Sequence, residues 1–387
     1  MKKICTVFCM IIILSLTISC VMPSKQIVFA DENDDIASFV KAAVLIEAKS
    51  GEILFEKNLD ARLPVASMVK LMTILLTCEQ IESGKITLET KISTTENASK
   101  MGGSQVFIDP YVEYSCGDLL KSVIISSAND ASVALAEYIS GSEEQFVAKM
   151  NERAKQLGLK NTLYANCTGL PAPEQYSSAI DCAIILKNLI SYDVYKTYSN
   201  VWMDELIHPS GRKTELVNTN KLIKYYNGCD CGKTGSTNEA GYCLSASAQK
   251  NNMRLISVVI GATNGQQRFK ESSILLNYGF ANFEIKQLVN KNCKLDRIKV
   301  LMSKQKEIDV FANEDFYVVD KKGGDSSYKC DIMLTNQITA PIDKNQCIGK
   351  LVITKNGKVI KELEIITACD VQKITYLDGI KKIAENW

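Results

Sequence analysis

Hydrophobic positions over residues 41–282 follow strand-like patterns at both ends and helix-like patterns between them. Apolar runs at 41–47 and 53–57, joined by a turn that contains Gly51, predict two paired strands. Helical spacing predicts helices that begin near residues 67, 117, 130, 143 and 178. Two more apolar runs, at 241–248 and 254–261, predict a hairpin, and a helix over 268–278 follows. This order predicts an α+β layout with one sheet.

The pattern changes after about residue 283. Helical periodicity ends there, and short apolar runs such as 316–319 and 351–354 alternate with turns rich in Gly, Asn and Asp. Regular short strands of this kind predict a small sandwich or barrel. The sequence therefore predicts one domain over residues 31–282 and a β-rich C-terminal domain over residues 283–372.

The two ends of the chain carry signals of another kind. A basic start, an apolar run over 4–18 and slim residues at 28–30 predict a signal peptide, residues 1–30, cleaved after Ala30. A lipoprotein acylated at Cys20 is the alternative, but residues 16–19 fit it poorly. Residues 373–387 place apolar side chains at every third position among lysines and end in Trp387. This pattern suits either a membrane surface or a terminal helix packed on its own domain. From these two signals we expect an exported protein at the extracytoplasmic face of the membrane.

Composition narrows the function classes. With 45 Lys and Arg against 44 Asp and Glu, the net charge is +1, which gives no reason to expect a nucleic-acid partner.

Three of the 14 cysteines lie in residues 1–30. The others are scattered without the repeated pairs of a zinc site, and we expect most of them to be reduced core residues, as at Cys78, Cys182 and Cys243. The single histidine, His208, is expected in a loop rather than in a Ser-His-Asp triad, and it cannot build a multi-histidine metal site.

Candidate chemistry begins at Ser67 and Lys70, where a helical run starts. Residues three apart on a helix share a face, so the two side chains can meet. A neutral, desolvated lysine can take the proton of a serine hydroxyl and make it a nucleophile. The spacing is common by chance, however, and an N-cap serine beside a solvated lysine is the simpler interpretation. Its meaning depends on the rest of the chain.

Two further motifs supply groups that such a pair needs. Ser127 and Asn129 lie between two predicted helices, where a hydroxyl can relay a proton and an amide can hold a substrate and orient Lys70. Lys233, Thr234 and Gly235 precede the 241–248 strand, where a cation and a hydroxyl suit the anionic end of a substrate. Each motif alone also fits a helix cap or a solvated strand start. Their order and separation make coincidence much less plausible.

Around these motifs the chain resembles the serine D-alanyl-D-alanine carboxypeptidases, the low-molecular-mass penicillin-binding proteins, near the type linked to sporulation. The resemblance covers essentially the whole mature chain, over residues 64–73, 100–104, 127–131, 166–170, 175–179, 218–222, 233–237 and 277–280. It implies a β-lactamase-like transpeptidase domain, with helices around an antiparallel sheet, followed by a small all-β domain. It also implies removal of the last residue from peptidoglycan stem peptides ending in D-Ala-D-Ala, covalent binding of β-lactam antibiotics, and no metal or cofactor.

The resemblance assigns roles residue by residue. It implies that Ser67 forms the acyl-enzyme, Lys70 is the general base and Ser127 shuttles the proton to the leaving amine. The substrate-binding residues that it implies are Asn129, Lys233, Thr234, Gly235, Ser236 and Arg268. Among these, Lys233, Thr234 and Arg268 would face the terminal carboxylate, and the N–H groups of Ser67 and Ser236 would form the oxyanion hole.

Two departures from the family pattern are visible. Residues 230–232 read Asp-Cys-Gly where the family usually has Asp-Gly and an apolar residue, and Thr168 stands where some members have histidine. Neither departure removes a catalytic atom.

Two other functions use related motifs. A class A-like β-lactamase needs a glutamate that activates water; Glu174 is available, but Ser178 replaces its asparagine partner, and the extra β domain also argues against this class. A non-catalytic penicillin-recognising sensor would show a damaged motif, and none of the three motifs is damaged.

Overall fold

The structure is a computed structural model that describes residues 36–375 and Asp378. The expected signal peptide, residues 1–30, lies outside the described residues, and so does most of the expected amphipathic segment, residues 373–387. Across the part of the chain that is described, no helix is long and apolar enough to cross a membrane.

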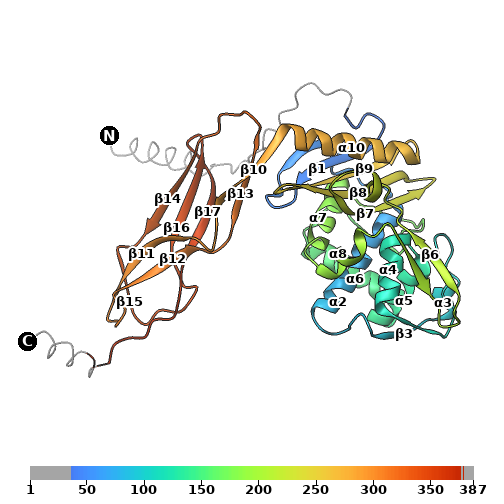
Figure 1. Cartoon of the computed structure of the whole chain (residues 1–387), viewed down its shortest axis with the longest axis horizontal. Coiled ribbons are helices and arrows are strands. Elements are labelled where there is room, and N and C mark those ends of the chain that lie inside the picture. Colours follow the sequence, from blue (N-terminus) through green and yellow to red (C-terminus); the bar gives the residue numbers. More distant parts are fainter. Residues whose placement is uncertain (1–35, 376–377, 379–387) are drawn as a thin grey trace, which may run out of the picture. The chain divides into compact units, whose positions relative to one another are not determined.

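A five-stranded antiparallel sheet forms the centre of the first domain (Figure 1). Its strands, in spatial order, are β2 (Ile53–Lys57), β1 (Ala42–Glu47), β9 (Met253–Ala262), β8 (Gly241–Lys250) and β7 (Cys229–Thr237). The predicted strand pair and the predicted hairpin are both confirmed. Strand β7, which carries the Lys233 motif, forms the edge of the sheet.

Helices cover both faces of this sheet. Side chains of β1 alternate between two cores, with Val44 in one and Leu45 in the other, as the two-residue period of a strand requires. Helix α7 (Ala179–Leu189) packs on the first face and α10 (Gly265–Asn282) on the second. All six residues of β1 are therefore buried, which explains its continuous apolar run.

Most of the other helices of this domain pack around a buried central helix, α2 (Lys70–Glu82). Every residue of α2 from Lys70 to Cys78 is buried, so the helix is apolar on nearly all sides. Serine side chains cap α4, α6 and α7 by accepting a backbone N–H of the first turn. The other elements are η1 (Ala66–Val69), α3 (Glu96–Ser99), α4 (Cys116–Ser126), α5 (Asn129–Ser140), α6 (Glu143–Gln156), α8 (Asp193–Ser199) and α9 (Leu222–Tyr225).

Two small two-stranded sheets accompany the main sheet, so the expectation of one sheet is incomplete. They pair β3 (Lys91–Ser93) with β4 (Glu113–Ser115) and β5 (Met203–Ile207) with β6 (Lys213–Val217). Their strands are three to five residues long. A two-residue period does not stand out over so few positions, which is why the sequence pattern did not reveal them.

Residues from Phe283 onward form the expected all-β domain. Its strands are β10 (Phe283–Val289), β11 (Lys294–Leu301), β12 (Glu307–Ala312), β13 (Phe316–Lys321), β14 (Tyr328–Leu334), β15 (Gln337–Thr339), β16 (Cys347–Lys355) and β17 (Lys358–Thr367). Strands β10 and β13 form one sheet, and a second sheet has the order β14-β16-β17-β12-β11-β15. Val289 of the first sheet and Val310 and Ile365 of the second belong to one buried cluster.

All eleven cysteines among the described residues are free thiols. Seven of them are buried, and these all lie in the first domain: Cys78, Cys116, Cys167, Cys182, Cys229, Cys231 and Cys243. The expectation of core cysteines is confirmed for these seven. These seven are the expected majority, and the other four cysteines among the described residues, Cys293, Cys330, Cys347 and Cys369 of the C-terminal domain, are exposed or half-buried.

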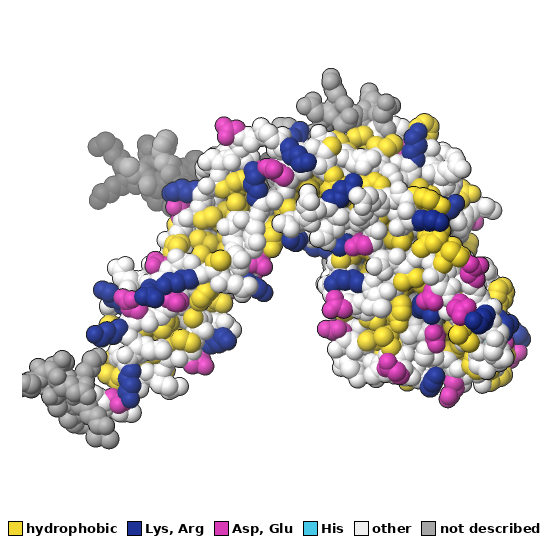
Figure 2. Space-filling view, viewed as in Figure 1, with side chains coloured by type: hydrophobic (Ala, Val, Ile, Leu, Met, Phe, Trp, Pro, Cys, Tyr) yellow, Lys and Arg dark blue, Asp and Glu magenta, His cyan; other side chains and the backbone are white. Residues whose placement is uncertain are grey.

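Surface charge is mixed in sign. On the face drawn in Figure 2, Lys and Arg side chains are interspersed with Asp and Glu over the described residues of both domains. This distribution agrees with the near-zero net charge of the whole chain.

Candidate active site

Ser67 lies in the short 3-10 turn η1, directly before α2. The backbone packs tightly against this turn at two glycines, Gly169 and Gly235. A Cβ atom on Gly169 would lie 2.1 Å from the carbonyl oxygen of Ala66. A Cβ atom on Gly235 would lie 2.4 Å from the carbonyl oxygen of Val65 and 3.0 Å from the Ser67 nitrogen. Only residues without a Cβ allow the loop and strand β7 to approach so closely.

Lys70, the first residue of α2, is buried with its Nζ among three oxygen atoms. Nζ lies 3.1 Å from Ser67 Oγ, 2.5 Å from Asn129 Oδ1 and 2.6 Å from the Thr168 carbonyl oxygen. None of these oxygens carries a formal charge that would stabilise an ammonium. Burial therefore lowers the pKa of Lys70 to about 7, although the Cys167 thiol and the Asp130 carboxyl act in the opposite direction.

The partners of Lys70 determine where its lone pair points. The side chain of Asn129 is oriented by its Nδ2, which donates to the Gly102 carbonyl at 2.6 Å, so Oδ1 faces Lys70. Asn129 Oδ1 and the Thr168 carbonyl can only accept, and each takes one N–H of Lys70. A neutral amine has two N–H bonds, which leaves its lone pair for Ser67. The Ser67 hydroxyl then donates to Nζ, as an activated nucleophile does to its base.

A second lysine joins the other two motifs. Ser127 ends α4 in the left-handed conformation, with φ of 62°. Lys233 Nζ donates to Ser127 Oγ at 2.7 Å and to the Thr234 carbonyl at 3.0 Å. Burial, and then the charges of Lys70 and Arg268, hold the pKa of Lys233 well below its usual range. This contact ties the α4–α5 connection to the edge strand β7.

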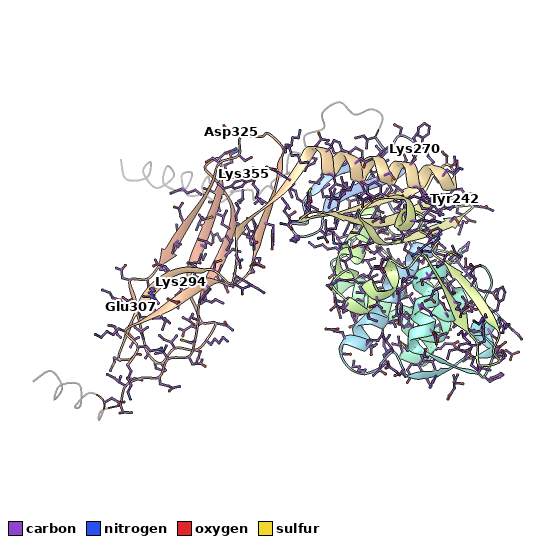
Figure 3. All side chains as sticks on the ribbon, in the orientation of Figure 1. Tyr242, Lys270, Lys294, Glu307, Asp325 and Lys355 are labelled. Atoms are coloured by element: carbon purple, nitrogen blue, oxygen red, sulfur yellow. The ribbon has the colours of Figure 1, made fainter. Side chains whose placement is uncertain are left out.

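Arg268 reaches strand β7 from the first turn of α10. Its Nη1 donates to the Gly235 carbonyl at 3.1 Å, and its guanidinium lies over the rings of Tyr242 and Phe269. Figure 3 labels Tyr242 on β8, the strand next to β7. Arg268 Nε is buried and has no hydrogen-bond partner within the described residues. A buried guanidinium N–H without an acceptor is costly, so this end of the site favours an incoming anion.

The structure thus brings all nine predicted site residues onto four segments that meet. Ser67 and Lys70 come from the η1–α2 turn, and Ser127 and Asn129 from the α4–α5 connection. Strand β7 supplies Lys233, Thr234, Gly235 and Ser236, and α10 supplies Arg268. Thr234 is buried, whereas Ser236 is exposed and pairs with Tyr242 of β8.

Sequence reasoning missed three groups that support the site. Two are the carbonyls of Thr168 and Gly102, which fix Lys70 and Asn129. Backbone carbonyls carry no residue-specific signal. The third is Asp130, whose buried carboxylate accepts the N–H groups of Val106 and Ile108 at 3.1–3.2 Å. An acidic residue next to Asn129, just before an apolar helical run, was the available clue.

The two departures from the family pattern leave the site intact. The pairing of β7 with β8 shifts between Cys229 and Cys231, which is a β-bulge, and stays in step from Cys231 to Thr237. The bulge absorbs the altered segment before Lys233 is reached. At Thr168, the side chain donates to Asn166 Oδ1, and the carbonyl is the group that contacts Lys70.

The other candidates for chemistry lie apart from this network. Glu174 is exposed, and Ser178 is the buried N-cap of α7. His208 lies in the β5–β6 loop as expected, but it is buried. Arg212 donates a hydrogen bond to Nδ1 of His208 at 3.1 Å. The ring proton of His208 is therefore on Nε2, which donates to Thr214. Burial and the Arg212 charge lower the pKa of His208, which marks a neutral structural residue.

Comparison with known proteins follows the same division of the chain. Residues 27–264 match the family model described as D-alanyl-D-alanine carboxypeptidase, and residues 283–373 match the penicillin-binding protein 5, C-terminal domain. The chain is 43% identical over 354 residues to D-alanyl-D-alanine carboxypeptidase DacF of Bacillus subtilis (strain 168), and the match covers 91% of each chain.

Solved structures show the same likeness. Penicillin-binding protein 5 from Haemophilus influenzae has a TM-score of 0.75 and 33% identity, over 89% of this chain and 100% of that one. Penicillin-binding protein D2 from Listeria monocytogenes, in the ampicillin-bound form, has a TM-score of 0.57 and 29% identity, over 64% of this chain and 100% of that one.

Replacing Gly169 tests how the Ser67 turn is held. Gly169→Ala forces a methyl group against the Ala66 carbonyl and also strains a left-handed backbone, with φ of 80°. Gly158→Ala is the matched control, because its φ is 72° but nothing lies within 4 Å of the added Cβ. The control is expected to cost about 1–2 kcal/mol of unfolding free energy. Gly169→Ala is expected to cost roughly 1–3 kcal/mol more. Equal losses in urea unfolding would show that the close approach does not matter.

Proposed function

The chain belongs to the D-alanyl-D-alanine carboxypeptidase family of serine peptidases, and from this premise we propose that Ser67 carries out the cleavage. The enzyme removes the terminal D-alanine from peptidoglycan stem peptides that end in D-Ala-D-Ala. One observation carries the assignment: the buried Lys70 Nζ lies within hydrogen-bond distance of two carbonyl oxygens and of Ser67 Oγ. A neutral amine that donates to both carbonyls keeps its lone pair for the Ser67 hydroxyl.

Acylation follows from this arrangement. Lys70 Nζ takes the Ser67 proton while Oγ attacks the carbonyl carbon of the penultimate D-alanine. The N–H groups of Ser67 and Ser236 hold the oxyanion that forms. When the C–N bond breaks, Ser127 gives its hydroxyl proton to the leaving amine and receives the proton that Lys70 took. D-Alanine leaves, and the shortened peptide stays on Ser67 as an ester.

Deacylation reuses the same base. With the amine gone, a water molecule takes its place, and neutral Lys70 removes a proton from it. The hydroxide attacks the ester carbonyl, and the C–O bond to Ser67 breaks. The proton held by Lys70 returns to Ser67 Oγ, which restores the free enzyme and releases the shortened stem peptide.

Lys233, Thr234 and Arg268 form the anchor for the substrate carboxylate. A carboxylate beside Lys233 supplies the negative charge that its uncharged partners, Ser127 and the Thr234 carbonyl, do not. β-Lactam antibiotics carry a carboxylate and a reactive amide, so they acylate Ser67 in the same orientation. Support for this comes from the similar Listeria monocytogenes protein, which was solved with ampicillin bound.

Serine variants test the nucleophile and the shuttle. Ser67→Ala is expected to abolish both D-alanine release from a peptide ending in Lys-D-Ala-D-Ala and covalent labelling by penicillin. Ser127→Ala is expected to lower kcat/KM by roughly 10²–10⁴-fold, the usual value of positioned acid–base catalysis. Ser126→Ala is the matched control, because the Ser126 hydroxyl is buried without a partner in the described residues. Penicillin labelling that survives in Ser67→Ala would refute the nucleophile assignment.

The pKa of Lys70 sets the expected pH dependence. Because Lys70 acts as a base, kcat/KM is expected to rise with pH through about 7 and to level off above it. Below that value, each decrease of one pH unit is expected to lower kcat/KM about tenfold, because most Lys70 side chains are then protonated. The rate of penicillin acylation, measured from pH 5 to pH 9, checks this. A flat profile over the whole range would exclude Lys70 as the base.

We further propose where the enzyme works. The proposed substrate, a peptidoglycan stem peptide, belongs to the cell wall, which supports work at the extracytoplasmic face of the membrane or in the cell wall. In this proposal, residues 1–30 are a signal peptide cleaved after Ala30, residues 31–282 form the catalytic domain and residues 283–372 form the β domain. The resemblance to the sporulation-linked type supports a role in trimming peptidoglycan during sporulation.

Truncation tests the membrane part of this proposal. Removing residues 374–387 takes away the predicted amphipathic segment and is expected to leave D-alanine release by the soluble enzyme unchanged. It is expected to lower the membrane-bound fraction, because the predicted segment would lay its apolar side chains in the membrane interface. Fractionation of cells that express both forms measures this. Equal membrane fractions would favour a terminal helix packed on its own domain.

A further inference from the structure

Strand β14 forms one edge of the larger sheet in the C-terminal domain (Figure 1). It pairs with β16 over its seven residues without a register shift, and within the described residues no strand pairs with its other side. Proteins commonly protect such edges with short strands, bulges or proline, because free backbone groups can pair with another chain. The opposite edge strand, β15, has only three residues. β14 contains neither a bulge nor a proline, so its edge is open to a further strand.

Alternate residues of β14 direct their backbone groups toward this open edge. In an antiparallel strand, the N–H and C=O of one residue point to one side and those of the next residue to the other. Asn356 donates to the Ser327 carbonyl, and a Cβ on Gly349 of β16 would lie 2.3 Å from the Met333 carbonyl oxygen. The odd-numbered residues therefore face β16. The backbone groups of residues 328, 330, 332 and 334 face outward.

Two opposite charges make this edge complementary to itself. Lys329 Nζ lies 2.6 Å from Asp331 Oδ1, and the side chains are 74% and 39% exposed. If a second copy of β14 pairs antiparallel about Cys330, each Lys329 lies opposite Asp331 of the other copy. Pairing about Asp331 would instead place two carboxylates opposite each other, which is unfavourable. Pairing about Ile332 would form no ion pair, so charge favours the register centred on Cys330.

The same register covers apolar surface. Ile332 is 41% exposed and lines an apolar pocket of about 310 Å³ between β14 and β10 of the other sheet. With the pairing centred on Cys330, Tyr328 of the second copy lies directly opposite Ile332. An aromatic residue opposite a β-branched residue is a favourable cross-strand pair. Backbone, charge and apolar contacts thus agree on one arrangement.

We propose that β14 pairs antiparallel with β14 of a second copy of this chain, with the twofold axis at Cys330. The large sheets of the two copies then form one continuous sheet. A contact through a single strand pair is small, so the association is weak and depends on the protein concentration. The surface uses none of the nine site residues, and the inference is therefore independent of the proposed function.

Charge variants test the pairing. Sedimentation velocity of the full mature chain, from about 10 µM to about 500 µM, is expected to show a monomer–dimer equilibrium. Asp331→Lys turns two attractive cross-strand pairs into repulsive ones and is expected to raise the dimer Kd roughly tenfold. Adding Lys329→Asp to this variant restores opposite charges across the axis and is expected to restore dimerisation.

Glu362→Lys is the matched control for these variants. It breaks an exposed ion pair of the same sheet, between Lys350 of β16 and Glu362 of β17, which lies away from the open edge. It is expected to leave dimerisation unchanged. D-Alanine release by Asp331→Lys is also expected to be unchanged, because Asp331 lies outside the active site.

Cys330 reports the register of the pairing. Opposite residues that exchange backbone hydrogen bonds have Cα atoms about 5.5 Å apart, which a disulfide can span. Oxidised glutathione is therefore expected to link two copies through Cys330. The two thiols lose two protons and two electrons to form the S–S bond, and glutathione disulfide is reduced to two glutathione thiols. Cys330→Ser is expected to abolish the covalent dimer and to keep the sedimenting one.

Peptide mapping of the oxidised dimer decides between the outcomes. A chain that stays monomeric over the whole concentration range would overturn the proposal, and so would a dimer that Asp331→Lys does not weaken. A covalent dimer joined through Cys293 or Cys347, both exposed, would place the contact elsewhere and overturn it as well. A dimer that oxidised glutathione does not link at all would refute the axis at Cys330.

Discussion

The burial of the Lys70 amine between two carbonyl oxygens is the constraint on which the rest of the site depends. An ammonium in this position would have only uncharged oxygens as partners, so burial lowers its pKa to about 7. The amine can therefore be neutral near physiological pH, and its remaining lone pair faces Ser67. Lys70 is buried because it belongs to α2, whose residues from Lys70 to Cys78 are all buried. The packing of this helix in the core therefore also lowers the pKa of the base. In the proposed mechanism, a more exposed Lys70 would be protonated and would not accept the serine proton.

Three separate segments must meet for this arrangement to exist. The Asn129 amide comes from the α4–α5 connection and the Thr168 carbonyl from the loop before α7. Strand β7 closes the third side, where Gly235 lies against the Ser67 turn. Contacts that span about 60 to 100 residues of sequence hold one amine in place. The close approach at Gly169 and Gly235 is the steric requirement for their convergence, because a Cβ at either position would separate two of the segments.

The sequence predicted the elements with strong periodicity and the side chains with distinctive spacing. Strands β1, β2, β8 and β9 and most helices of the first domain could be located because each buries a regular apolar face. The three motifs indicated Ser67, Lys70 and Lys233 through residue type and order. The Thr168 carbonyl and the two small two-stranded sheets could not be found this way. A backbone group has no sequence signal, and strands of three to five residues are too short to show a period. His208 shows the same limit, since a loop position in sequence says nothing about burial by Tyr114 and Thr214.

In the proposed mechanism, the two buried lysines have different roles, and only Lys233 meets the substrate anion. Lys233 lies on strand β7 and Arg268 on α10. Burial lowers the pKa of both side chains, because it disfavours their charged forms. Lys233 finds only a hydroxyl and a carbonyl as partners, and Arg268 leaves its Nε without an acceptor in the described residues. A carboxylate that binds here satisfies both groups at once and favours the charged form of Lys233. Lys70 is held by carbonyls and needs no such anion to remain a base. In the proposed mechanism, Lys70 is therefore the base and Lys233 binds the substrate carboxylate, because the carboxylate reaches only Lys233.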